Sequence, residues 1–392
     1  MRLRRLAASG VALAAWLAAC RPVSAPTPQP TPTPSPTPEL VRVKPPPLID
    51  DVARESLVAA IDRDLEASDR IGTSDCPGPV VAQSLQSLRQ AAARPQTDLA
   101  QYVATRFEFR RSTGREDGAL FTGYYEPVLA ARRRAEAGFV YPLYRRPRDL
   151  LEIRLGEFDP EWSDVTIWGR VVGGKLAPYY TRRQIDGEKA LAGRGLELAW
   201  LDDPVARYFL QVQGSGILRW EDGSLAHVGF AGSNGKPYTS IGRMLADEGA
   251  FGTDRATSPA IQAYLRAHPE RLDDVLFRNE RYVFFAEAAD GPVGRLGVKL
   301  TGERSIAVDP SFYPLGWLAY VETTAPVVDA SGKMTASRPL RRLMLMQDTG
   351  AAITGPGRAD IFFGTGEQSG LEAGSMSQRG EFYLLTPVEC RH

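Results

Sequence analysis

Three aspartates in the C-terminal part of the chain are the residues best suited to chemistry. Asp309, Asp348 and Asp360 each follow or border an apolar stretch that is typical of a β-strand. An aspartate beside Gly or Pro often only stabilises a turn, but three at strand ends could converge at one end of a barrel. A carboxyl group in partly apolar surroundings near other carboxylates has a raised pKa and can act as a general acid at neutral pH. Such an acid suits glycosidic cleavage, in which the leaving oxygen must be protonated.

Two other hydrolytic chemistries fit the sequence less well. Asp348-Thr349-Gly350 matches the tripeptide around the catalytic aspartate of aspartic proteases. Those enzymes need two carboxylates that share a proton, whereas this chain has one such tripeptide, preceded by the polar Gln347. The Gly-Ser-Gly run at residues 214–216 lacks the spacing of a serine-hydrolase elbow.

Aromatic and amide side chains elsewhere in the chain could bind a sugar. Aromatic rings can stack on sugar faces, and polar groups can hydrogen-bond to hydroxyl and acetamido groups. The candidates are Tyr124, Tyr125, Trp168, Tyr179, Tyr180, Gln211, Gln213, Ser215 and Asn234. Many of the tyrosines could equally belong to a barrel core or rim.

Composition excludes several classes of function. Lys and Arg number 47 and balance the 47 Asp and Glu, so no overall field would recruit nucleic acid. With only three histidines and three cysteines, we expect no metal site and no cofactor. Cys76 and Cys390 could form a disulfide in an oxidising compartment or remain two unrelated thiols.

The N-terminus is typical of a bacterial lipoprotein signal. A basic start is followed by an apolar stretch at residues 11–19 that is too short to span a bilayer comfortably, and Cys20 comes directly after it. We expect residues 1–19 to be removed and Cys20 to be lipidated, with Arg21 favouring the outer membrane. The Pro-rich residues 20–47 would form an extended linker on the periplasmic side. The cell wall is then the first polymeric target to consider.

The remaining chain alternates between helical and strand patterns. Residues 48–112 and 237–277 have helical periodicity, while residues 120–224 and the part after 282 consist of short apolar runs between Gly and Pro turns. This pattern predicts a mainly β protein with helical additions, and favours a barrel over a doubly wound sheet.

Several segments resemble the membrane-bound lytic murein transglycosylase A (MltA) family. They occur in the family's order over about residues 95–388, and include FTGYYEP, PYYTRRQID, YFLQVQGSG, YTSIGRML, GPVGRLGVKLTGERSIAVDPSFYPLGW and DTGAAITGPGRADIFFGTGEQSGLEAG. The C-terminal part is similar to the three-aspartate (3D) domain, whose acidic positions fall here on Asp309, Asp348 and Asp360. The resemblance implies a double-psi β-barrel with an inserted smaller β-domain and flanking helices. Residues 48–124 would be the N-terminal helical part, 125–280 the insert and 281–392 the catalytic domain, with the glycan strand in a groove between the two β-domains.

The resemblance also implies a mechanism with one aspartate. Asp360 would protonate the oxygen between N-acetylmuramic acid and N-acetylglucosamine, then accept the proton of the muramic acid C6 hydroxyl as the 1,6-anhydro ring closes. Asp348 and Asp309 would support it, and the charge of Arg358 could lower its pKa. The substrate-binding residues would be Tyr124, Tyr125, Tyr179, Gln211, Gln213, Gly214 and Ser215.

Two alternatives stay open, a hydrolytic muramidase and a non-catalytic peptidoglycan-binding lipoprotein. The expected partners are peptidoglycan strands, the outer membrane through the lipid anchor, and a cell-wall synthesis complex. No nucleic acid partner is expected.

Overall fold

The computed structural model describes residues 40–112, 118–163, 165–251, 256–289, 291–330 and 332–390. The predicted signal peptide, Cys20 and most of the predicted linker lie outside these residues. Within the described ranges, no helix is both long and apolar enough to cross a membrane.

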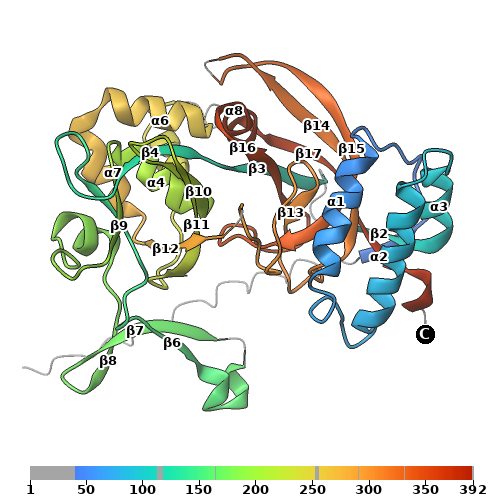
Figure 1. Cartoon of the computed structure of the whole chain (residues 1–392), viewed down its shortest axis with the longest axis horizontal. Coiled ribbons are helices and arrows are strands. Elements are labelled where there is room, and N and C mark those ends of the chain that lie inside the picture. The colour runs from blue at the N-terminus through green and yellow to red at the C-terminus, as the bar shows by residue number, and fades with distance from the viewer. Residues whose placement is uncertain are drawn as a thin grey trace, which may run out of the picture. The chain divides into compact units, whose positions relative to one another are not determined.

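A closed barrel is formed by six strands of the largest sheet (Figure 1). The strands of this sheet are β1 (Leu40–Val43), β2 (Phe107–Ser112), β3 (Ala119–Glu126), β13 (Ser305–Ala307), β14 (Leu318–Val328), β15 (Met334–Asp348), β16 (Arg358–Thr365) and β17 (Ser377–Pro387). They pair in the order β1-β2-β17-β14-β15-β13-β16-β3, and the pairing of β3 with β17 closes the ring. The β13–β15 and β16–β3 pairs are parallel and the others antiparallel. The predicted mainly β barrel is confirmed, while its double-psi connectivity stays a prediction.

Three helices between β1 and β2 pack on the barrel. They are α1 (Arg54–Leu65), α2 (Gly78–Ala92) and α3 (Leu99–Arg106), which contact β15, β17 and β2 respectively. The helical prediction for residues 48–112 is thus confirmed up to Arg106, whereas residues 107–112 form the strand β2, which pairs with β1 and β17. In α1 the buried positions are Leu57, Ala60, Ile61 and Asp64, which is one face of a helix with a carboxyl group in a core position.

Two buried arginines attach the chain preceding α1 to the barrel. Arg304 donates to Asp50 (2.9 Å) and to the Leu343 carbonyl oxygen (2.7 Å). Arg342 binds both carboxylate oxygens of Asp51, at 2.8 and 3.0 Å. A buried guanidinium left without such partners would be strongly destabilising. The folded body, by which we mean the described part of the chain, begins earlier still, because residues 40–43 of the predicted linker form β1.

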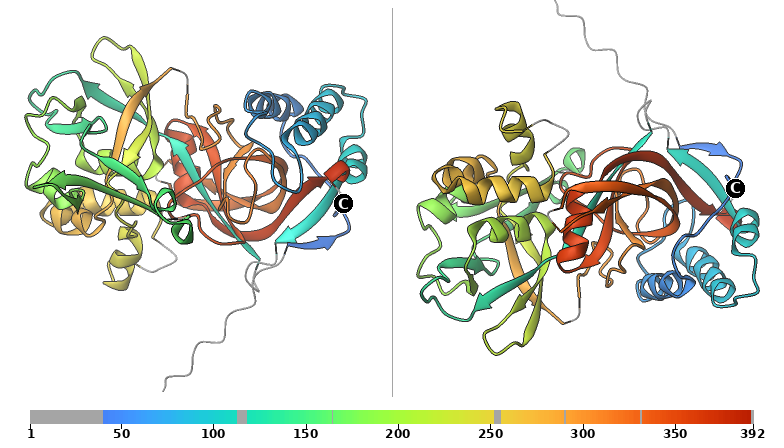
Figure 2. Two further views of the ribbon diagram at one scale, coloured as in Figure 1. Left: turned by 90° about the horizontal axis from the view of Figure 1, so that it is seen from below. Right: turned by 90° about the horizontal axis from the view of Figure 1, so that it is seen from above.

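The residues between β3 and β13 build two further sheets (Figures 1 and 2). The six-stranded sheet has the order β12-β11-β10-β4-β9-β5, and the three-stranded sheet has the order β6-β7-β8. Their bounds are β4 Val128–Arg132, β5 Tyr141–Tyr144, β6 Leu151–Arg154, β7 Thr166–Val172, β8 Lys175–Pro178, β9 Glu197–Leu201, β10 Ser215–Arg219, β11 Leu225–Ser233 and β12 Val283–Ala288. The six-stranded sheet extends past the predicted boundary at residue 280, because β12 pairs with β11 along one edge.

Two segments predicted to be β are helical, residues 204–213 and, in the part after residue 282, residues 367–375. Residues 204–213 form α4 (Pro204–Gln213), although their apolar run favoured a strand. Asp203 caps the helix by accepting from the Val205 N–H, Pro204 occupies its first turn, and Gly214 ends it with a left-handed φ of 83°. These capping signals outweigh the strand-like composition. The other helices are α5 (Ile241–Asp247), α6 (Ser258–Ala267), α7 (Leu272–Arg278) and α8 (Glu367–Ser375), of which the first three confirm the helical prediction for residues 237–277.

Cys76 and Cys390, whose pairing the sequence left open, form a disulfide. The bond joins the segment between α1 and α2 to the chain that follows β17, across 314 residues. A covalent link over so long a loop restricts the unfolded chain strongly.

We expect the Cys76→Ser/Cys390→Ser variant to lose about 2–5 kcal/mol of unfolding free energy, as removal of a native disulfide typically does. Urea unfolding under oxidising conditions measures this loss, and the unmodified protein under reducing conditions should lose a similar amount. An unchanged denaturation midpoint would contradict the expectation.

Candidate active site

Asp360 is positioned by the parallel pairing of β16 with β3. In this register Asp360 lies opposite Thr122, whose hydroxyl donates to Asp360 Oδ1 at 2.6 Å. This is the one hydrogen bond that the described residues make to the Asp360 carboxyl, and the residue remains partly accessible to solvent. Its second oxygen is therefore available to a substrate.

Asp348 is positioned by Tyr124, two residues after Thr122 on the same face of β3. The Tyr124 hydroxyl donates to Asp348 Oδ2 at 3.1 Å, and the Arg295 N–H donates to Oδ1 at 2.8 Å. Tyr124 is buried against Phe362, with 5.2 Å between the ring centroids. Burial and the charges of Asp348 and Asp360 raise the pKa of Tyr124 well above its ordinary value, so the hydroxyl stays a donor.

Asp309 holds the loop that connects the other two aspartates. Its Oδ2 accepts from the Gly355 N–H at 2.6 Å and its Oδ1 from the Ser311 N–H at 3.0 Å. Nearby, the Tyr313 hydroxyl accepts from the Gly357 N–H at 3.0 Å. The structure therefore gives Asp309 a loop-anchoring position, with both carboxylate oxygens occupied.

The carboxyl groups of Asp348 and Asp360 both have raised pKa values. Burial raises the pKa of Asp360, against the opposing effects of the Arg358 charge and the Thr122 hydrogen bond. Burial also raises the pKa of Asp348 to about 6, and the charge of Asp360 acts in the same direction. Arg358 has the predicted influence on Asp360, but desolvation is the larger effect. The site can thus hold a proton near neutral pH, as a general acid requires.

A buried series of hydrogen bonds next to Asp348 explains why the residue before it is the polar Gln347. The Gln347 amide donates to Asp64 Oδ1 at 2.6 Å and to the Ala60 carbonyl oxygen at 3.2 Å, and its oxygen accepts from the Ser305 hydroxyl. These contacts join α1 to the ends of β13 and β15. Burial raises the pKa of Asp64 to about 8, and no described residue forms a hydrogen bond with its Oδ2.

Part of the predicted sugar-binding set lies next to β3. The Tyr125 N–H donates to Gln213 Oε1 at 3.1 Å, so the end of α4 meets the end of β3. Gly214 ends α4, and Ser215 begins β10 and is almost fully buried. Both polar atoms of the Gln211 side chain are buried and have no hydrogen-bond partner among the residues that the structure describes. An amide of this kind is costly unless water or a ligand satisfies it.

Tyr179 lies elsewhere, in a hydrophobic core of the two sheets formed between β3 and β13, which we call the second β region. It is 2% exposed, its hydroxyl donates to Asp149 at 3.1 Å, and its ring packs edge-on against Phe284. Asn234 is similarly occupied, since its amide binds the carbonyl oxygens of Tyr180 and Glu280. No hydrogen bond among the described residues connects either side chain to the three aspartates.

Thr122 is the site residue that the sequence analysis missed. A threonine in a strand carries no chemical signal, and it contacts Asp360 only because two strands 238 residues apart pair in this register. Within the described part of the chain, no group of three His, Cys, Asp or Glu residues could hold a metal ion.

Comparison with known proteins identifies the family. The family model of the MltA specific insert domain matches residues 120–286, and that of the 3D domain matches residues 304–386. The crystal structure of a membrane-bound lytic murein transglycosylase from Agrobacterium tumefaciens is 31% identical, with a TM-score of 0.71, over 86% of this chain and 93% of that chain. The chain belongs to the MltA family.

Other MltA relatives agree with this assignment. Membrane-bound lytic murein transglycosylase A of Vibrio cholerae is 31% identical over 69% of this chain and 66% of its own length, just under two thirds. The crystal structure of Escherichia coli MltA with bound chitohexaose has a TM-score of 0.69 at 25% identity, over 89% of this chain and 94% of that chain. All three aspartates lie within the matched 3D domain.

The influence of Arg358 on Asp360 predicts a shift in pH dependence. Arg358→Gln removes a positive charge that favours the ionised carboxylate, so the pKa of Asp360 rises and its acid form persists to higher pH. We expect the alkaline limb of the kcat/KM profile to move to higher pH in an assay with murein, the polymer named for the enzyme's relatives. Arg358→Lys keeps the charge and should leave the limb nearly in place. A limb that stays fixed or moves to lower pH in Arg358→Gln would exclude this coupling.

The raised pKa of Asp64 predicts a pH-dependent stability. Between its unfolded value near 4 and its folded value of about 8, the folded protein holds a proton that the unfolded chain has lost. Stability should therefore fall as the pH rises through this window, by on the order of 1 kcal/mol per unit from this group. We expect Asp64→Asn to show a shallower loss between pH 5 and pH 8 in urea unfolding. Equal slopes for the variant and the unmodified protein would refute this role of Asp64.

Proposed function

We propose that the protein is a lytic transglycosylase that cleaves the β-1,4 bond between N-acetylmuramic acid and N-acetylglucosamine in peptidoglycan. One observation carries the proposal. Of the three aspartates, only Asp360 has a carboxyl oxygen that the described residues leave without a donor, and burial raises its pKa. The names of its MltA relatives support the same reaction class.

In the proposed reaction Asp360 acts first as acid and then as base. Its protonated carboxyl gives a proton to the glycosidic oxygen as the bond from that oxygen to C1 of muramic acid breaks. The muramic acid C6 hydroxyl oxygen then bonds to C1, and its proton passes to the Asp360 carboxylate. The products are a free N-acetylglucosamine 4-hydroxyl and a 1,6-anhydromuramic acid end, with Asp360 protonated again.

The hydrogen bonds of Asp348 and Asp309 favour attack on C1 by the muramic acid C6 hydroxyl over attack by water. A hydrolytic muramidase needs a second carboxylate to activate water or to form a covalent intermediate. Asp348 accepts hydrogen bonds on both oxygens, and Asp309 does the same within its loop. With these oxygens occupied, Asp348 is suited to tuning the charge around Asp360, and Asp309 to holding the loop that leads to it.

The glycan would bind across the ends of β3 and α4. The buried amide of Gln211, which has no partner among the described residues, has a donor and an acceptor that suit an acetamido group, and the partly exposed Tyr125 lies beside Gln213. Tyr124, Gly214 and Ser215 would shape the same region. Tyr179 is proposed with them from the family resemblance, and its burial points to a supporting role in the core. The chitohexaose bound by the Escherichia coli relative supports a sugar chain as ligand.

The protein is further proposed to be an outer-membrane lipoprotein that faces the periplasm. The support is the sequence around Cys20 and the membrane-bound description of its relatives. A cell-wall synthesis complex stays a predicted partner.

The catalytic proposal predicts that Asp360→Asn loses murein cleavage by at least about 10²-fold, because the general acid is gone. Mass spectrometry of the muropeptides released from purified peptidoglycan should show anhydro ends from the unmodified protein and almost none from the variant. Asp222→Asn, a change at an exposed turn, should cleave normally. Reducing ends from the unmodified protein would assign a hydrolase instead, and full cleavage by Asp360→Asn would remove Asp360 from the mechanism.

A further inference from the structure

The three-stranded sheet β6-β7-β8 has one face made of apolar side chains. Residues directly opposite each other in an antiparallel pair lie on the same face. Ile153 is opposite Ile167, Leu151 is opposite Gly169, and Leu176 is opposite Val171. Because side chains alternate along each strand, these pairs share one face. We call this set the apolar face: Leu151, Ile153, Ile167, Gly169, Val171, Leu176 and Pro178.

On the opposite face of this sheet, Trp168 and Arg170 contact the rest of the protein, while Val172 at the end of β7 is exposed. The guanidinium carbon of Arg146 lies 5.2 Å from the centre of the Trp168 ring. The guanidinium carbon of Arg170 lies 4.1 Å from the centre of the Tyr180 ring. Gly235 approaches Trp168 so closely that a Cβ at residue 235 would overlap the indole side chain. The apolar face therefore points away from the body.

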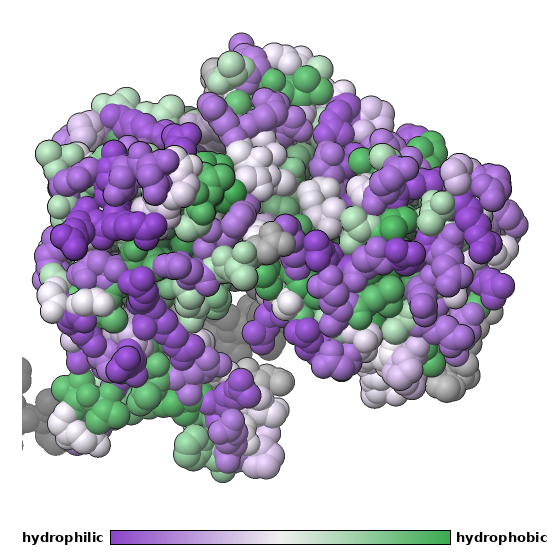
Figure 3. Space-filling view, in the orientation of Figure 1, coloured by the Kyte–Doolittle hydropathy of each residue, from purple (hydrophilic) through white to green (hydrophobic). Residues whose placement is uncertain are grey.

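Several side chains of the apolar face are strongly exposed. Val171 is 62% exposed, Leu176 47% and Leu151 38%. Figure 3 shows apolar residues gathered over β7 and β8. Phe158 and Trp162, in the segment between β6 and β7, are also exposed, at 79% and 51%. Exposed apolar side chains gathered in this way indicate a contact surface.

The size of the apolar face helps to identify what covers it. Three strands at about 4.8 Å spacing and four residues at about 3.3 Å rise give a footprint of about 200 Å². A stable complex between free proteins buries about 800 Å² on each partner. The face is too small to hold a second copy or a diffusing protein by itself. It suffices as an additional contact for a protein that is already tethered, because a tether keeps the local concentration of the surface high.

The chain that precedes the body supplies such a tether. The first described residue, Leu40, lies 20 residues after Cys20, and the extended linker expected from this Pro-rich sequence would reach about 60 Å at about 3 Å per residue. A bilayer anchored through Cys20 is therefore within reach of the body. Aromatic residues such as Phe158 and Trp162 favour the boundary between headgroups and acyl chains.

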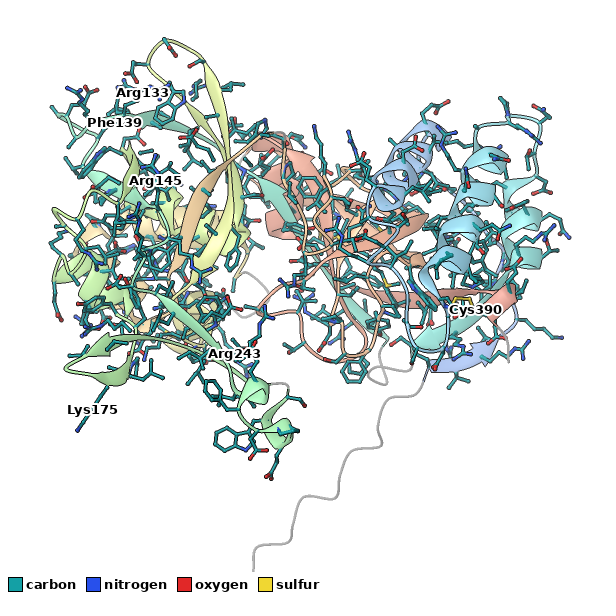
Figure 4. The ribbon with its side chains drawn as sticks, turned by 60° about the horizontal axis from the view of Figure 1, so that its bottom comes forward. Arg133, Phe139, Arg145, Lys175, Arg243 and Cys390 are labelled. Atoms are coloured by element: carbon teal, nitrogen blue, oxygen red, sulfur yellow. A yellow bond between two sulfur atoms is a disulfide. The ribbon has the colours of Figure 1, made fainter. Side chains whose placement is uncertain are left out.

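We propose that the apolar face of β6-β7-β8, together with Phe158 and Trp162, lies on the bilayer to which the lipidated Cys20 attaches the protein. This inference rests on the lipid anchor of the proposed function. The attraction is apolar, because the segment from residue 151 to 178 carries more acidic than basic residues. The acidic residues are Glu152, Glu157, Asp159, Glu161 and Asp164, and the basic ones are Arg154, Arg170 and Lys175. Lys175 begins β8, where its side chain points away from the sheet (Figure 4).

A fluorescent label on the apolar face tests the contact in the full lipidated chain. With Cys20 acylated and Cys76 bonded to Cys390, Val171→Cys adds the one free thiol, which is labelled with an environment-sensitive dye. Leu225→Cys is the matched control, at a 59% exposed apolar position in the six-stranded sheet. Both proteins are reconstituted into phosphatidylethanolamine–phosphatidylglycerol vesicles and separated by flotation. Iodide quenching and murein cleavage are then measured on the same samples.

We expect both proteins to float and only the label at residue 171 to be blue-shifted and protected from iodide. Protection should persist at high salt and decrease when Leu151→Ser and Leu176→Ser are added. Equal quenching at residues 171 and 225 in floating, active protein would overturn the contact and leave the anchor and the reaction intact.

Two further outcomes would also overturn the proposal. Protection that appears without vesicles and grows with protein concentration would assign the face to a second copy of the chain. Failure to float would remove the anchor and this contact together, while murein cleavage in the same sample would preserve the catalytic proposal.

Discussion

The parallel pairing of β3 with β16 is the interaction on which the rest of the site depends. It closes the barrel together with the β3–β17 pairing, and it places Thr122 against Asp360 and Tyr124 near Asp348. Parallel neighbours cannot be joined by a short hairpin, so the chain between them must return by a long connection. In this protein that connection contains the complete second β region. The placement of Thr122 and Tyr124 next to the two aspartates therefore depends on this one strand pairing.

Desolvation and donor placement together distinguish three otherwise similar carboxyl groups. Asp309 and Asp348 each receive donors on both oxygens, which fixes them in place. Asp360 receives a single donor from Thr122, and burial raises its pKa despite the nearby Arg358. The environment thus leaves one aspartate with a raised pKa and an accessible oxygen. The buried contact from Asp64 through Gln347 adds support behind Asp348 by connecting α1 to the strand ends.

The same packing rules explain why β6-β7-β8 differs from the other sheets. In the barrel and in the six-stranded sheet, most apolar side chains are buried against helices or opposing strands, although Val128, Leu225 and Phe230 of the six-stranded sheet are exposed. In the three-stranded sheet, the face that carries Trp168 and Arg170 makes the contacts with the body. The apolar side chains of its other face remain exposed, although apolar and polar residues alternate along its strands as they do in a sheet with one buried face. An exposed face with the composition of a core calls for a partner outside the chain.

The sequence by itself determined the residue types and their local order. The apolar runs that end in Asp309 and Asp348 or follow Asp360, the helical periodicity up to Arg106 and the family motifs were sufficient for a mainly β barrel and for the three acidic positions. The polar candidates Gln211, Gln213 and Ser215, which lie in or next to α4, were also found from the sequence. The helix itself was not predicted, because the apolar composition of residues 204–213 resembles that of a strand. The N-cap at Asp203 and the left-handed Gly214 mark its two ends in the structure.

Only the tertiary structure decided which aspartate remains available and which side chains meet it. Thr122 donates to Asp360 across 238 residues, and Cys76 pairs with Cys390 across 314. Tyr179, which resembled a sugar-binding residue, lies in a core instead. Such relations depend on strand register and on burial, which bring distant residues together and remove water from them. A linear sequence specifies these contacts only through the fold as a whole.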